Sequence, residues 1–168
     1  MSLKVTQAIE YGISLIGIPY ELWTSGPCQI REPMWAENGP PPNKNEIVSC
    51  NCAGLVNLIL RYSNKEIPHT NNTRGGTPNY FLYYQDVSKD IDINNNYPVG
   101  TLLMRNFRDV KDQGHLAVVI ENKGKDSKIL QSHYEKNGFN GVNIKYTLEE
   151  SHSGYYYEKI VLPDDWLE

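Results

Sequence analysis

Three side chains carry the chemistry that this sequence could perform: Cys52, His115 and His133. Cys52 stands where a polar segment runs into an apolar one that is typical of a helix. The N-terminus of such a helix presents unpaired N–H groups and the positive end of the helix dipole. Both favour the thiolate, so we expect the pKa of Cys52 to be lowered and its thiol to be a nucleophile. The same N–H groups could stabilise a developing oxyanion.

A thiol nucleophile needs a base and a group that orients the base. His115 opens one predicted strand and His133 closes the next one along the chain. If the two strands are antiparallel neighbours, the two imidazoles lie close together. His115 could then be the base, and His133 could hold its ring in the correct tautomer. His152 is the rival for the third position, and His69 is a more remote candidate.

Apolar periodicity predicts the helices that must position these groups. Residues Leu3 to Ile16 repeat apolar side chains at three- and four-residue spacing. Residues Cys52 to Tyr62 are apolar on most sides, which is typical of a buried helix, and Ser49 or Asn51 could cap it. A third helix is expected from Thr77, as N-cap, to about Val87.

The second half of the chain has the pattern of a sheet. Short apolar or alternating runs are separated by Gly, Asn and Asp, as expected for strands. These runs are Thr101 to Arg105, His115 to Glu121, Lys128 to His133, Val142 to Tyr146 and Tyr155 to Val161. Helices followed by strands predict an α+β fold with an antiparallel sheet, in a single domain over residues 1–168. Residues Thr24 to Asn45, rich in Gly, Pro and Asn, are expected to form a long loop.

Composition excludes several classes of protein. The formal net charge is −4 and the basic residues are scattered, so nucleic acid is not an expected partner. No apolar stretch approaches a membrane span, and Met1 to Glu10 lacks the pattern of a secretory signal. Three cysteines are few, and an odd number cannot all pair, so a disulfide framework is not expected. We therefore expect an intracellular protein, and the oligomeric state stays open.

The cysteines also suggest a rival reading, a metal-binding module built from Cys28, Cys50, Cys52 and a histidine. Zinc sites usually show pairs of cysteines separated by two to four residues, with a second pair downstream. The Cys50–Cys52 spacing is too tight, and no second pair follows. We expect no metal and no cofactor, with Cys50 acting as a spacer or core residue.

Several motifs resemble those of NlpC-type cysteine peptidases, compact papain-like enzymes best known as bacterial cell-wall hydrolases. Asn51-Cys52-Ala53-Gly54-Leu55-Val56 resembles the family's Asp-Cys-Ser-Gly-Leu-Val signature. Three further segments resemble its Gly-x-Pro-Tyr segment, its Pro-Gly-Asp-Leu sheet entry and its Gly-His-Val strand: Gly17 to Tyr20, Pro98 to Leu102, and Gly114 to Leu116. The strand after these ends in a second histidine, matched by His133. The motifs follow the family's order from about residue 3 to 161.

The resemblance implies a papain-like fold and an acyl-enzyme mechanism without a cofactor. Cys52 would attack the carbonyl of a peptide or other amide, with His115 as base and His133 orienting it. Tyr20 would lie near the site and support the oxyanion.

The chain departs from the family pattern at two positions beside the nucleophile. Asn51 replaces the Asp that helps the cell-wall enzymes hold a free amine, and Ala53 replaces Ser. We therefore expect blocked or internal peptides, or other amides, as substrates. Two alternatives stay open: a thiol acyltransferase or lipid ester or amide hydrolase, as among relatives of lecithin retinol acyltransferase, and an inactive binding domain on the same fold.

Overall fold

The computed structural model describes residues 1–22, 28–30 and 37–168, and it confirms the predicted α+β class. A six-stranded antiparallel sheet has the order β3-β8-β4-β5-β6-β7, and β1 and β2 form a separate pair. The strands are β1 (Cys28–Ile30), β2 (Ile47–Cys50), β3 (Lys89–Asp90), β4 (Leu102–Arg105), β5 (His115–Val119), β6 (Ile129–His133), β7 (Gly141–Asn143) and β8 (Lys159–Val161). The helices are α1 (Leu3–Ser14), α2 (Cys52–Tyr62), α3 (Thr77–Tyr83), α4 (Leu148–Tyr155) and α5 (Pro163–Trp166), with 3-10 turns η1 (Lys44–Glu46) and η2 (Gly124–Asp126).

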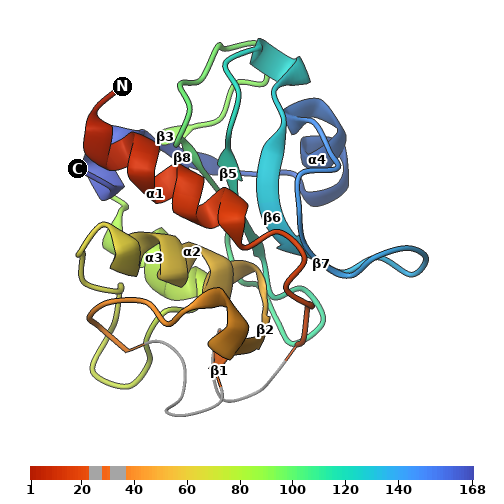
Figure 1. Cartoon of the computed structure of the whole chain (residues 1–168). Coiled ribbons are helices and arrows are strands. Elements are labelled where there is room, and N and C mark those ends of the chain that lie inside the picture. Colours follow the sequence, from red (N-terminus) through yellow and green to blue (C-terminus); the bar gives the residue numbers. More distant parts are fainter. Residues whose placement is uncertain (23–27, 31–36) are drawn as a thin grey trace.

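Both faces of the sheet are covered, because successive side chains of each strand point to opposite sides. In β5, Leu116 and Val118 join the core formed with α1 and α2, which lie across one face of the sheet (Figure 1). Ala117 and Val119 join a second core that includes Leu148 of α4. The central strand is therefore buried on both sides, and its first residue, His115, is buried with it.

Helix α2 begins at Cys52 and ends at Tyr62, as predicted. Asn51 is its N-cap, and the Asn51 side-chain oxygen accepts a hydrogen bond from the Gly54 N–H at 2.8 Å. Such a cap typically contributes about 1 kcal/mol. The helix is buried from Ala53 to Arg61, so its packing against the sheet fixes the position of its first residue.

The segment from Gly17 to Tyr20 runs between β2 and β7 and joins them. Its Pro19 carbonyl accepts from the Cys50 N–H, and its Tyr20 N–H donates to the Asn140 carbonyl, both at 3.0 Å. Gly141 makes this close approach possible, because a Cβ there would lie 2.3 Å from the carbonyl oxygen of Ile18. The result places Tyr20 beside the start of α2.

The prediction of a strand from Tyr155 to Val161 is wrong at its first half. Tyr155 ends helix α4, and β8 begins only at Lys159. A capping box starts this helix: the Thr147 hydroxyl accepts from the Glu150 N–H, and the Glu150 carboxylate accepts from the Thr147 N–H. Tyr156 is the C-cap of this helix and adopts the left-handed conformation with φ of 55°.

Other segments differ from expectation. Strand β7 ends at Asn143 rather than Tyr146, and helix α1 ends at Ser14 rather than Ile16. The predicted loop from Thr24 to Asn45 contains strand β1 with Cys28, and η1 begins at Lys44, while residues 24–27 and 31–36 lie outside the described residues. Helix α3 ends at Tyr83, four residues early, and Gly76 rather than Thr77 is its N-cap. Across the ranges that the structure describes, no helix is both long and apolar enough to cross a bilayer.

Candidate functional site

A surface pocket of about 180 Å³ lies where the start of α2 meets the start of β5. The pocket is lined by residues from both sides of this junction: Tyr20, Leu22, Cys52, Val110, Lys111, Gln113, Gly114, His115, Ser132, Tyr134 and Tyr155. Three residues that the sequence singled out, Cys52, His115 and Tyr20, are thus brought together. His133 and Asn51 are not among the lining residues.

The thiol of Cys52 is half-buried at the first position of α2. Burial raises the pKa of Cys52, and hydrogen bonds from the N–H groups of Leu116 and Ala53 and from the Thr77 hydroxyl oppose this. The predicted lowering of the Cys52 pKa is therefore wrong in direction. The helix terminus does supply N–H donors, as expected, but loss of water around the sulfur outweighs them.

His115 is held by its partner on the neighbouring strand. Its side chain is only 3% exposed, and its Nε2 lies 2.7 Å from the Oε1 of Gln131. An amide oxygen only accepts, so this bond puts the imidazole proton on Nε2 and leaves the Nδ1 lone pair as the basic nitrogen. Burial lowers the pKa of His115 to about 3, while Gln131 raises it and His133 lowers it further. The resting imidazole is therefore neutral.

Cys52 and His115 meet through the backbone of β5. The thiol accepts from the N–H of Leu116, the residue after His115, and both side chains line the pocket. In the described part of the chain no hydrogen bond joins the two side chains directly. Catalytic hydrogen bonds often tighten only when substrate binds.

Gly114 allows the turn that delivers His115. Its φ is +80°, and a Cβ at this position would lie 2.4 Å from the Arg105 carbonyl oxygen. A side chain is thus excluded by both conformation and space. The Gly-His pair of the sequence motif has this structural basis.

Gln131, and not the predicted His133, is hydrogen-bonded to His115. The His133 and His115 ring centroids are 6.3 Å apart and the rings are edge-on. The His133 Nδ1 is bonded instead to the Tyr155 hydroxyl at 2.5 Å. Because alternate residues of a strand share a face, Gln131 and His133 point to the same side, and Gln131 takes the position diagonal to His115.

Tyr155 links the two histidines. Its ring stacks on His115 with a centroid distance of 3.7 Å and an interplanar angle of 5°, while its hydroxyl bonds to His133. Burial lowers the pKa of His133, Glu135 opposes this, and Lys145 adds to it. The neutral His133 ring accepts a hydrogen bond from the Tyr155 hydroxyl, so His133 meets His115 only as an edge-on ring neighbour and is hydrogen-bonded to Tyr155.

The other candidates have different surroundings. Burial, followed by the nearby Cys52 and Cys50, raises the pKa of Tyr20 to about 12, so its hydroxyl remains a donor. The oxygen of Asn51 is engaged in the helix cap. Nδ1 of His152 accepts from the Tyr157 N–H at 3.1 Å, and Nδ1 of His69 lies 3.2 Å from the Ile67 carbonyl oxygen. Neither of these histidines lines the pocket.

Cys50 is a core residue, as predicted. Its carbonyl accepts a hydrogen bond from the Ser132 hydroxyl at 2.8 Å, which ties β6 to the chain two residues before Cys52. Among the residues that the structure describes, no cluster of His, Cys, Asp and Glu is arranged to hold a metal ion.

Sequence reasoning missed three contributors to the site: Gln131, Tyr155 and Thr77. Gln131 had a signal, because it precedes His133 by two residues and must share its face. Thr77 was interpreted as a helix cap, whereas its hydroxyl donates to Cys52. Tyr155 was assigned to a strand and is the last residue of α4.

Comparison of the chain with family models, curated proteins and solved structures gives no match. The likeness to NlpC-type peptidases therefore rests on the motifs quoted above. The interpretation of the site rests on the residues themselves: a cysteine at a helix N-terminus and an oriented, buried histidine on one pocket.

Proposed function

We propose that this protein is a cysteine hydrolase of the papain-like, NlpC-type fold that cleaves an amide bond through an acyl-enzyme. One observation carries the proposal. Cys52 at the N-terminus of α2 and His115, fixed by Gln131, line the same pocket. A nucleophile, a base and an orienting group are the parts that such chemistry requires.

Because Cys52 and His115 are both neutral at rest, the first step combines attack by sulfur with transfer of its proton. As the Cys52 sulfur attacks the substrate carbonyl, its proton moves to Nδ1 of His115, which becomes an imidazolium. The carbonyl oxygen takes the negative charge and is stabilised by N–H groups at the start of α2 and by the Tyr20 hydroxyl. The tetrahedral intermediate then collapses, and His115 gives its proton to the departing amine.

Water completes the cycle. His115 takes a proton from a water molecule as the water attacks the thioester carbon, and the carbon–sulfur bond breaks. The proton returns from His115 to the Cys52 sulfur, and a carboxylic acid leaves. The enzyme regains its thiol and neutral imidazole, and no cofactor enters the balance.

Two contacts of His115 favour its change of charge, against the burial that lowers its pKa. Gln131 accepts from Nε2–H in both protonation states, so the ring keeps its orientation. The stacked Tyr155 ring presents its electron-rich face to the imidazolium, an interaction worth about 1–2 kcal/mol when desolvated. The attack is thereby assisted at the moment when the charge develops.

The test is labelling of the native protein with an iodoacetamide probe, peptide mapping, and hydrolysis of blocked fluorogenic peptides. We expect labelling at Cys52 before the other thiols, and turnover that labelling abolishes. Cys50→Ala is the control, and it should keep both properties. Hydrolysis of acyl esters without peptides would instead favour a lipid enzyme, and a labelled Cys52 without any turnover would favour a binding domain.

A further inference from the structure

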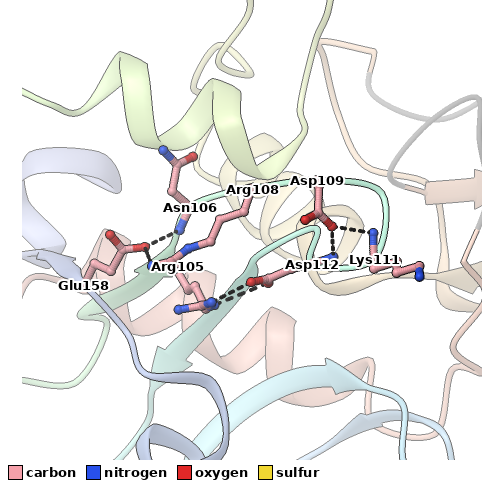
Figure 2. Close-up of polar contacts among 7 residues, drawn as sticks. All are labelled: Arg105, Asn106, Arg108, Asp109, Lys111, Asp112 and Glu158. Atoms are coloured by element: carbon pink, nitrogen blue, oxygen red, sulfur yellow. Dashed lines mark hydrogen bonds and ion pairs between the residues drawn. The ribbon is translucent and has the colours of Figure 1, made fainter.

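The loop between β4 and β5, residues 106–114, forms one wall of the pocket and is internally braced. The Arg105 guanidinium pairs with the Asp112 carboxylate at 2.6 Å, and Figure 2 shows how the two side chains face each other. The Asp109 carboxylate accepts from the N–H groups of Lys111 and Asp112 at 2.7 and 2.9 Å. A loop with these bonds holds its tip, Val110, in a defined place.

A second anchor fixes the loop to β8. The Glu158 carboxylate accepts from the Asn106 N–H at 3.1 Å and pairs with Arg108 at 3.5 Å (Figure 2). The loop is therefore held at its start by Arg105 and Asp112, near its tip by Asp109, and against β8 by Glu158. It is built to present a fixed surface to the pocket.

That surface is apolar and exposed. Val110 is 81% exposed, and Leu22 and Tyr134, which also line the pocket, are 59% and 60% exposed. A single exposed apolar residue on a protein surface carries no meaning. Here three such side chains come from three separate segments and converge on the pocket that holds Cys52, which marks a place for an apolar group of a ligand.

The basic side chains of the wall differ in whether they are paired with a carboxylate. Arg105 and Arg108 are each paired with a carboxylate, whereas in the described structure no carboxylate pairs with the Lys111 ammonium. Lys111 lines the pocket, and no Asp or Glu is among the described lining residues. Among the described lining residues, the pocket therefore offers a ligand the Lys111 ammonium and no carboxylate.

We infer that the wall selects substrates that carry a carboxylate next to an apolar side chain. Lys111 pairs with the carboxylate, and the apolar group lies between Val110, Leu22 and Tyr134. This inference rests on the proposed function for its chemistry. The recognition itself can be measured on the thiol alone, without any turnover.

The charge arm compares alkylation of Cys52 by iodoacetate, an anion, and by iodoacetamide, its neutral analogue. The ratio of the two rates cancels any change in thiolate content, and free glutathione supplies the intrinsic ratio. Relative to wild type, we expect Lys111→Gln to lower the iodoacetate-to-iodoacetamide ratio by about 3–10-fold. The control is Lys4→Gln, which removes an equally exposed charge from the first turn of α1 and should leave the ratio unchanged.

The apolar arm compares N-phenyl iodoacetamide with iodoacetamide. We expect wild type to favour the phenyl reagent, and Val110→Ser to reduce that preference by about 2–5-fold. Val87→Ser is the matched control, because Val87 is an exposed valine that does not line the pocket.

The outcomes separate the two proposals. Unchanged ratios in Lys111→Gln and Val110→Ser, with Cys52 still labelled first and peptides hydrolysed, would overturn the selecting wall and leave the hydrolase standing. Shifted ratios without hydrolysis of any carboxylate-bearing amide would support the wall as a binding surface while the hydrolase fails. Both ratios shifting, together with faster hydrolysis of carboxylate-bearing than of amidated substrates, supports both.

Discussion

The two sides of the candidate site are built by different kinds of contact. On the helix side, Cys52 is positioned by a cap between Asn51 and Gly54, three residues apart. On the sheet side, His115 is oriented by Gln131, sixteen residues away. The position of Cys52 is thus a local property of the sequence, whereas the orientation of His115 depends on which strands pair and in which register.

The sharpest test of the helix side is Cys52→Ala. We expect hydrolysis to fall by about 10⁴-fold or more, because the covalent step is lost. The free energy of unfolding should change little, since the thiol is half-buried and a small residue replaces it. Steady-state kinetics and urea unfolding give the two values. Retained activity would mean that another residue is the nucleophile, and the comparison between the helix side and the sheet side would no longer hold.

The largest expected effect on the sheet side concerns acid stability. The folded pKa of His115 is about 3, below the ordinary 6.5, so the unfolded chain binds a proton that the folded chain does not. The stabilising contribution is complete above pH 6.5 and is lost as the pH falls towards 3, by on the order of 3–5 kcal/mol. Urea unfolding across this range should show a steeper loss in wild type than in His115→Gln. Parallel curves for the two proteins would mean that His115 titrates normally.

Gln131→Leu tests whether orientation is set by register. We expect kcat to fall by roughly 10–100-fold with little change in KM, which is about 1.4–2.7 kcal/mol. Gln131→Asn, with a shorter amide, should recover only part of this. His133→Asn is the matched comparison and should cost less, because the hydrogen bond of His133 goes to Tyr155, whereas Gln131 bonds His115 directly. The reverse ranking would restore His133 to the orienting role.

The smallest effect belongs to the cap. Asn51→Ala should lower the free energy of unfolding by about 1 kcal/mol, while Asn51→Asp should keep the cap and favour the helix dipole. Thermal unfolding of both variants measures the difference. If Asn51→Asp also creates a preference for free-amine over acetylated peptides, the side chain reaches substrate as well as the helix.

The elements that sequence predicted well are those governed by local periodicity. Helix α2 has the predicted bounds, and β4, β5 and β6 lie within a residue or two of theirs. Helix α4 had a local signal too, the Thr147-x-x-Glu150 capping box, but the tyrosines after it favoured a strand.

Other features of the site depend on the folded environment. Burial by residues distant in sequence raises the pKa of Cys52 and lowers the pKa of His115. The choice between Gln131 and His133 follows from register, since both share a face of β6. No window of the sequence around either residue contains that information.

The segment from Gly17 to Tyr20 has a kinetic consequence. It joins β2 to β7. We therefore expect Tyr20 to reach the pocket only after these strands have formed. Contacts between residues far apart in sequence must first overcome loop-closure entropy, and they slow folding. We expect helix α2 to gain its structure early in refolding, and the full reactivity of Cys52 to be acquired among the last steps.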